Sequence, residues 1–94
     1  MQTNDMIMEL KENIRQYIAT NMLFSDKGFP HSDDASFLEE GIIDSVGFME
    51  LVAYVQQTFG IEVGPEDLVP DNFDSVNKLA RYVSAKQAAT QRAS

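Results

Sequence analysis

The sequence predicts an all-α protein, a small four-helix bundle with three longer helices and one short helix. Two observations predict this class. Apolar residues recur at intervals of three and four in three stretches of the 94-residue chain, which is the spacing of helices with one buried face. No stretch shows the regular alternation of apolar and polar residues that a half-buried strand requires. The helices are therefore expected to pack as an antiparallel bundle around one core.

The composition is that of one domain able to fold alone. Hydrophobic residues make up 44% of the chain and include six Phe and three Tyr, which is too apolar for a disordered segment. We expect a single domain over residues 1–94, with an ordered core from about residue 4 to residue 84. The small, polar tail over 85–94 is expected to fray, and the protein is expected to be a monomer.

The first predicted helix covers residues 3–21, and Thr3, Asn4 or Asp5 can cap its first turn. Its buried stripe consists of Ile7, Leu10, Ile14, Tyr17 and Ile18. The following segment, 22–43, lacks periodicity and is rich in turn residues, so it is predicted to be a long loop. Four apolar residues are expected to hold its second half to the core: Phe37, Leu38, Ile42 and Ile43.

The second predicted helix begins at Asp44 or Ser45 and ends at Phe59, because Gly60 can adopt the left-handed conformation that ends helices. Its core stripe consists of Phe48, Leu51, Val52, Val55 and Phe59. Off this stripe lie Val46, Met49 and Ala53, so the helix has more apolar surface than one core contact requires. Either the helix packs on several sides in the bundle, or the surplus forms a docking face.

Two further helices complete the prediction. A short helix of one or two turns is expected at Pro65, where Glu66 and Asp67 complement the positive end of a helix. The last long helix opens within residues 74–76. Its inward face consists of Val76, Leu79, Ala80 and Val83.

Charge is distributed unevenly along the chain, whose net charge is -8. Residues 26–74 contain twelve acidic residues and one basic residue, whereas residues 75–94 contain four basic residues and no acid. An acidic surface repels nucleic acid and anionic lipid and favours basic partners, although a merely solvated face is its commoner meaning. The longest uncharged stretch, 51–61, is too short to span a membrane, and the first residues do not resemble a signal peptide. We therefore expect a cytoplasmic protein without nucleic-acid or membrane partners.

The usual catalytic constellations are missing from the sequence. There is no cysteine and only one histidine, His31, which excludes thiol chemistry and most histidine-based sites. Ser45 does not lie in a Gly-x-Ser-x-Gly elbow, so a serine hydrolase is not indicated. The acidic clusters near Asp33 and Asp71 lack the glycine and distant glutamate of an EF-hand loop. The prediction is a protein that is not an enzyme and has no metal site.

Ser45 is a candidate for covalent modification. The N-terminus of a helix carries free N–H groups and partial positive charge, so it stabilises an attached phosphate. The simpler interpretation is that Asp44 or Ser45 only caps the helix. The tripeptide Asp-Ser-Val also occurs at 74–76, at the start of the last helix, so the tripeptide alone is a weak signal.

Four segments, by their residues and their spacing, resemble the acyl carrier and peptidyl carrier protein family. They are Phe-Leu-Glu-Glu-Gly-Ile-Ile-Asp-Ser-Val at 37–46, Glu-Leu-Val at 50–52, Phe-Gly-Ile-Glu-Val at 59–63 and Phe-Asp-Ser-Val at 73–76. In that family a transferase moves 4'-phosphopantetheine from coenzyme A to the serine of an Asp-Ser-Leu motif at the start of the second helix. The resemblance implies that Ser45 carries this group and that Ser75 is a plain cap. The prosthetic thiol would hold an acyl or aminoacyl group as a thioester.

The resemblance also implies partners. They would be a phosphopantetheinyl transferase, an adenylating ligase that loads the acyl or aminoacyl group, and a downstream synthase, dehydrogenase or thioesterase. Asp44 would help the transferase to recognise the site. The docking surface would comprise Val46, Met49, Glu50 and Ala53 on the second helix, with Glu66 and Asp67 on the third.

The chain departs from the family pattern on its second helix. Val46 replaces the usual leucine, and Gly47, Gln56 and Gln57 stand where fatty-acid carriers often have acids. Docking is therefore expected to rely on apolar contact more than on charge. In this respect the chain is more similar to carriers of secondary-metabolite biosynthesis, aminoacyl carriers included. A housekeeping fatty-acid carrier is one alternative, and an unmodified helical interaction module is another.

Overall fold

The protein is all-helical over residues 3–93, the part of the chain that the computed structural model describes, with side chains described for residues 7–89. Three longer helices are present, α1 (Thr3–Asn21), α2 (Ser45–Phe59) and α4 (Val76–Ala93). Two short elements lie between the last two of them, a 3-10 helix η1 (Pro65–Asp67) and a one-turn helix α3 (Pro70–Phe73). No strand occurs in the described part. The predicted fold class is confirmed.

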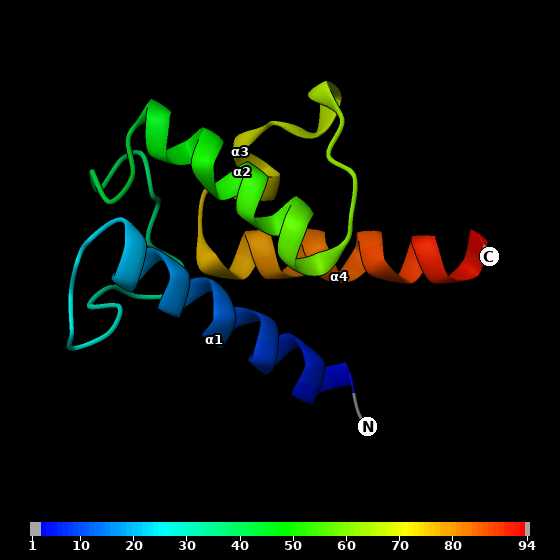
Figure 1. The fold of residues 1–94 in the computed structure, drawn as a ribbon, viewed down its shortest axis with the longest axis horizontal. Helices are drawn as coiled ribbons and strands as arrows, with labels where there is room; N and C mark the ends of the chain where they lie inside the picture. Colours follow the sequence, from blue (N-terminus) through cyan, green and yellow to red (C-terminus); the bar gives the residue numbers. More distant parts are fainter. Residues whose placement is uncertain (1–2, 94) are drawn as a thin grey trace.

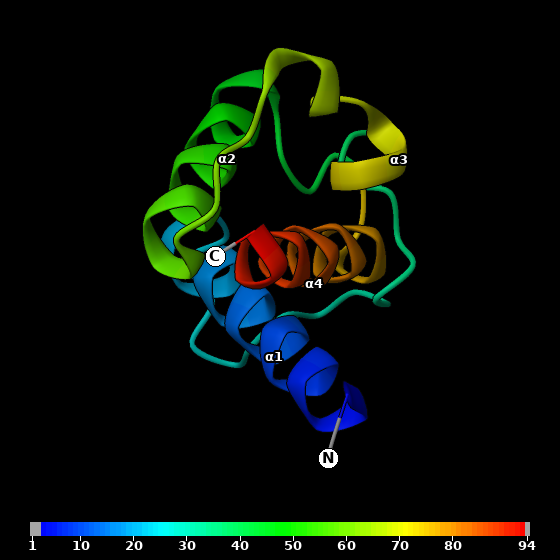
Figure 2. The ribbon, with the colours of Figure 1, turned by 90° about the vertical axis from the view of Figure 1, so that its right-hand side faces the viewer.

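Helix α4 lies at the centre of the bundle. Figure 2 shows it almost end-on, with α1, α2 and α3 arranged around it. Helices α1 and α4 pack against each other and run in opposite directions (Figure 1). Helices α1 and α2 are joined by stacked rings, because the centroids of Tyr17 and Tyr54 lie 3.9 Å apart. None of the described helices is long and apolar enough to cross a membrane.

The core forms where the predicted apolar stripes meet. Residues from α1, α2, α3, α4 and the long loop are fully buried, among them Ile14, Ile18, Phe37, Leu51, Val55, Phe73, Val76, Leu79 and Val83. Burying one such side chain contributes about 1.5–3 kcal/mol, so these residues dominate the stability of the bundle. Phe48 and Phe59 of α2 pack against this core while remaining partly exposed.

The long loop before α2 is fastened to α1, to the end of α3 and, through Asn77, to α4. Its residue Asp33 accepts two hydrogen bonds from the guanidinium group of Arg15 on α1, both 2.7 Å long. At the end of α3, the carboxylate of Asp74 accepts hydrogen bonds from the Ser36 hydroxyl and, at 3.1 Å, from the Leu38 N–H. The backbone N–H of Phe37 donates to the Asp74 carbonyl over 3.0 Å. These bonds fix the chain that leads into α2.

The structure differs from the sequence predictions at Leu38 and in the segment between α2 and α4. Leu38 does not anchor the loop, because 49% of its surface is exposed; its backbone is held instead. The predicted short helix at Pro65 is η1, and the additional turn α3 follows it because Pro70 favours the first turn of a helix. Helix α4 extends through Ala93, since alanine and glutamine favour helices and no glycine or proline interrupts residues 85–93; the fraying of this tail stays a prediction.

Candidate functional site

The start of α2 is formed by a cap that leaves Ser45 free. Asp44 has an extended backbone, and its Oδ1 accepts a hydrogen bond of 2.8 Å from the Gly47 N–H. The Asp44 carbonyl accepts a hydrogen bond of 2.8 Å from the Phe48 N–H. Ser45 is therefore the first residue of the helix, with an exposed side chain. Of the two candidate caps, Asp44 and Ser45, only Asp44 caps the helix.

The second Asp-Ser-Val tripeptide, residues 74–76, lies one residue earlier relative to the start of its helix than the first copy does. Helix α4 begins at Val76, so Ser75 precedes the helix, and its Oγ accepts a hydrogen bond of 3.1 Å from the Lys78 N–H. Ser75 is only 2% exposed, and Val76 is fully buried. In the first copy, by contrast, Val46 is 69% exposed. The two serines thus differ in both accessibility and hydrogen bonding.

Gly47 allows the chain to pack closely at the start of α2. A Cβ atom at this position would lie 2.8 Å from Cγ2 of Ile43 and 3.3 Å from Oδ1 of Asp44. Ile43 is buried, and its Cγ2 branches directly from Cβ, so it has little freedom to move away. A side chain at position 47 would therefore disturb both the core contact of Ile43 and the Asp44 cap. The sequence shows only that glycine stands where fatty-acid carriers often have an acid. The close contact with Ile43 gives a physical reason for the glycine.

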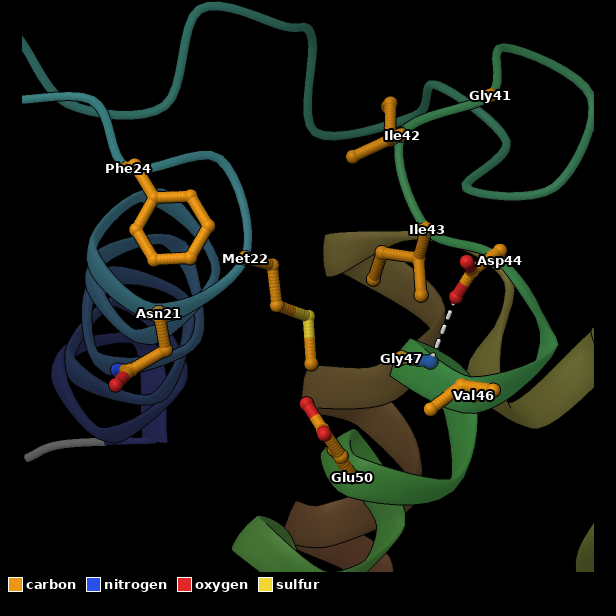
Figure 3. A pocket seen from close by; sticks show the side chains of 10 residues that line it. All are labelled: Asn21, Met22, Phe24, Gly41, Ile42, Ile43, Asp44, Val46, Gly47 and Glu50. Carbon is orange, nitrogen blue, oxygen red and sulfur yellow. Dashed lines mark hydrogen bonds between the residues drawn. The ribbon is translucent and has the colours of Figure 1, made fainter.

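A pocket of about 430 Å³ opens between the end of α1 and the start of α2. Figure 3 shows Asn21 and Phe24 on the α1 side, Val46 and Glu50 on the α2 side, and Met22 reaching between them. The remaining lining residues are Gly41, Ile42, Ile43, Asp44 and Gly47. Helix periodicity gives no sign of this pocket, because its two walls come from separate segments of the chain, 21–24 and 41–50.

Phe24 is the most unusual residue of the pocket. Its side chain is 83% exposed, and its φ of 53° lies in the left-handed region that favours glycine. Hydrogen bonds on both sides hold this turn, from Leu23 N–H to Ile18 O at 2.9 Å and from Ser25 N–H to Ala19 O at 2.8 Å. The left-handed conformation costs a residue with a Cβ about 1–2 kcal/mol. No sequence signal distinguishes Phe24 from other residues of the loop.

The surface around Ser45 is both apolar and acidic. Besides Val46, Met49 is 55% exposed, and Ala53 is exposed one turn further along α2. These residues do not pack in the bundle, so the interpretation of α2 as a helix buried on several sides is wrong for this face. The exposed acids nearby are Glu39, Glu40, Asp44 and Glu50, and none has an ion-pair partner within the described residues.

Glu66 and Asp67, which the family resemblance places together in the docking surface, differ in their contacts. Both belong to η1 and not to a longer third helix. Glu66 is exposed, whereas the carboxylate of Asp67 accepts a hydrogen bond of 2.7 Å from the Tyr82 hydroxyl and lies 3.4 Å from Lys86 Nζ. The Tyr82 hydroxyl lowers the pKa of Asp67, and Lys86 adds to this effect. Asp67 thus ties η1 to α4.

Comparisons with known proteins agree on one family. The sequence model of the family described as "PP-binding: Phosphopantetheine attachment site" matches residues 12–83. The D-alanyl carrier protein of Abiotrophia defectiva is 29% identical over 56 residues, which are 60% of this chain and 71% of that protein. The D-alanyl carrier protein of Streptococcus pyogenes serotype M5 (strain Manfredo) is 30% identical over 56 residues, with the same 60% and 71% coverage. Residues 12–83 include both Ser45 and Ser75, so the family match does not choose between them.

Proposed function

Because this chain belongs to the phosphopantetheine-dependent family of acyl and peptidyl carrier proteins, we propose that Ser45 is the residue that carries the prosthetic group. The family match implies a covalently attached 4'-phosphopantetheine. One observation supports Ser45 most strongly: it is the exposed first residue of α2, whereas Ser75 is buried and occupied as a helix cap. A transferase can reach the hydroxyl of Ser45 without unfolding a helix end.

The local electrostatics are compatible with a phosphodiester at Ser45. The first turn of α2 presents backbone N–H groups that have no partner inside the helix, and the helix dipole adds partial positive charge there. In the transfer, Ser45 Oγ forms a new bond to the phosphorus of coenzyme A that bears pantetheine. The pyrophosphate P–O bond at this phosphorus breaks, adenosine 3',5'-bisphosphate leaves, and the hydroxyl proton passes to the transferase. When bound, the group supplies a thiol, which the chain itself lacks because it has no cysteine.

Intact mass spectrometry tests the attachment. The purified protein is incubated with coenzyme A and a broad-specificity phosphopantetheinyl transferase. We expect a mass gain of one phosphopantetheine in the wild type and in Ser75→Ala, and none in Ser45→Ala. In denaturant titrations, Ser75→Ala should lose about 1 kcal/mol because it removes a cap, whereas Ser45→Ala should stay within about 0.5 kcal/mol of wild type. No gain in the wild type, or a gain in Ser45→Ala, would disprove the assignment.

The cargo that fits best is an aminoacyl group, loaded by an adenylating ligase. The similarity to two D-alanyl carrier proteins supports this choice, as does Glu50, the single charged residue of α2. The similarity does not specifically favour secondary-metabolite biosynthesis, which remains one pathway for such a carrier.

Downstream, a synthase, dehydrogenase or thioesterase would take the cargo, and we place these steps in the cytoplasm. A housekeeping fatty-acid carrier would instead accept long acyl groups. Loading the holo-protein with amino acids and fatty acids in parallel, and releasing the thioesters with hydroxylamine, would separate the two.

Partner enzymes would dock on the exposed face of α2. The surface comprises Val46, Met49, Glu50 and Ala53, with Glu66 at its edge and the engaged carboxylate of Asp67 beside it. Asp44, whose Oδ1 holds the cap, would present its other oxygen to the transferase. Two exposed apolar residues at the centre and few charges indicate binding by apolar contact.

Met49→Glu tests this surface. We expect it to lower the kcat/KM of loading at least tenfold, because a charge would be buried against the partner, while the free energy of unfolding changes by less than about 0.5 kcal/mol. Met8→Glu is the matched control, since Met8 is also exposed, at 64%, but belongs to α1. Equal loading by wild type and Met49→Glu would show that partners dock elsewhere.

A further inference from the structure

Phe24 is a residue for which the folded chain alone gives no reason. An aromatic side chain that is 83% exposed contributes little to the core, and its φ of 53° would suit glycine better. Strained residues that are held by their surroundings are often found at functional sites. Phe24 forms part of the wall of the pocket at the start of α2. Its position suggests a ligand that occupies this pocket.

The pocket offers a mixture of apolar and polar contacts. Its volume of about 430 Å³ falls in the range typical of small-molecule sites. Met22, Phe24 and Val46 supply apolar surface, and Glu50 supplies a carboxylate. The amide nitrogen of Asn21 donates to the Tyr17 carbonyl over 3.2 Å, so its amide oxygen remains available as an acceptor. A ligand with methyl groups and amide N–H groups would match this lining.

We propose that this pocket holds the pantetheine part of the prosthetic arm when Ser45 is modified, an inference that rests on the attachment proposed above. Ser45 itself does not line the pocket, but its neighbours Asp44 and Val46 both do. Side chains on a helix lean toward its N-terminus, so the arm leaves Ser45 toward the end of α2 where the pocket opens. Three other cavities have no lining residue between 41 and 50; one is lined by residues from 12–29, one by residues from 9–13, 58–59 and 87, and one by residues from 13–21 and 54.

The chemistry of the arm complements the lining. Pantetheine carries a pair of methyl groups on one carbon, a hydroxyl, two amides and a terminal thiol. The methyl groups would contact Phe24 and Met22, and the amide N–H groups would donate to Glu50 or to the Asn21 oxygen. Because the arm is tethered next to the pocket, its effective concentration there reaches the millimolar range, so even weak contacts are occupied.

Nuclear magnetic resonance on the apo- and holo-protein tests this proposal directly. With an isotopically labelled arm, we expect nuclear Overhauser effects from the paired methyl groups to the Phe24 ring and the Met22 methyl group. The signal of the Met8 methyl group should not move, because Met8 is exposed on α1 and does not line the pocket. Contacts to Met49 or Val69 in place of Phe24, or no contacts at all, would overturn the proposal.

A variant supplies a second readout. Phe24→Gly removes the ring and relieves the left-handed strain, so its apo form should melt at a higher temperature than the wild-type apo form. Modification should raise the melting temperature of wild type and of Met8→Ala by about 2–5 °C, and this increase should vanish in Phe24→Gly. An unchanged increase in Phe24→Gly would overturn the pocket assignment. A chain that gains no mass with coenzyme A would overturn both proposals, whereas a modified chain without contacts at Phe24 would overturn this one alone.

Discussion

At the scale of single residues, the position of a helix cap decides which serine is accessible. Asp44 caps α2 with its carboxylate, which places Ser45 one residue inside the helix and exposes it. At the start of α4 the capping oxygen is Oγ of Ser75 itself, and this residue is buried. A shift of one residue rotates a side chain by about 100° around the helix axis. Identical tripeptides therefore present their serines to different surroundings.

Gly47 is predicted to be sensitive to substitution because of Ile43. In wild type, Gly47→Ala should reduce the free energy of unfolding by about 1–2 kcal/mol, since the clash at 2.8 Å outweighs the higher helix propensity of alanine. In an Ile43→Ala background the same change should cost less, because the obstructing Cγ2 atom is gone and only the contact of 3.3 Å with Asp44 Oδ1 remains. Urea titrations of the four proteins in this double-mutant cycle measure the coupling.

Gly64→Ala is the matched control for Gly47. A Cβ at position 64 would lie 2.8 Å from Glu66 Oε2, but this is the flexible end of an exposed side chain. We expect the glutamate to move aside, so that stability changes by less than about 0.5 kcal/mol. Equal losses at both glycines, or additivity between positions 43 and 47, would contradict the proposed contact.

At the scale of elements, η1 is positioned through its side-chain bonds to α4. The Tyr82 hydroxyl donates to Asp67 Oδ2, and the Tyr82 ring lies 5.0 Å from the ring of Phe73. Burial raises the pKa of Tyr82, and the neighbouring carboxylate of Asp67 raises it further. The tyrosine therefore stays protonated and remains a donor throughout the neutral range. The edge of the proposed docking surface is held by this pair.

Tyr82→Phe tests this connection. The ring can keep its packing against Phe73, but the hydrogen bond to a charged acceptor is lost, so we expect a destabilisation of about 1–2 kcal/mol. The pKa of Asp67 should rise toward its ordinary value, which carboxyl carbon shifts in a pH titration would record. Tyr54→Phe, which loses a bond of 3.2 Å to the Asn13 carbonyl at an exposed site, should cost less. An unchanged Asp67 titration in Tyr82→Phe would refute the connection.

At the scale of the whole molecule, the acidic loop is held by a small number of opposite charges. Asp33 is bound in a bidentate manner by Arg15, and Lys11 Nζ lies 3.8 Å from Asp33 Oδ2. The hydrogen bond from Arg15 lowers the pKa of Asp33, and the charges of Arg15 and Lys11 act in the same direction. Because the folded-state pKa lies below the unfolded one, this carboxylate stabilises the fold above the unfolded pKa.

The stability of the protein should therefore fall in acid. The contribution of Asp33 is complete above its unfolded pKa of about 3.9 and is lost as the pH drops through its lower folded-state pKa. At neutral pH, Asp33→Asn should cost on the order of 1 kcal/mol, and this difference from wild type should shrink as the pH falls below the unfolded pKa of the carboxyl. Thermal melts across this range measure the effect. A constant difference between Asp33→Asn and wild type at every pH would disprove the linkage.

Much of the fold could be predicted from local patterns. The limits of α1 and α2, the stop at Gly60 and the inward face of α4 follow from residues a few positions apart, because helix periodicity and caps are local properties. The turn α3 was missed, since a single proline gives a weak signal. The burial of Leu38 was predicted wrongly, because its backbone holds the loop while its side chain faces outward.

The sequence by itself determined an all-α carrier with Ser45 at the start of a long, partly apolar helix. Only the tertiary structure decided that Ser75 is buried, that Gly47 lies against Ile43 and that Asp67 is bound to Tyr82. It also brought Phe24 and Val46 to opposite walls of one pocket. The physical reason is that side-chain accessibility and pairing depend on contacts between segments distant in the chain, and helix periodicity carries no information about which segments meet.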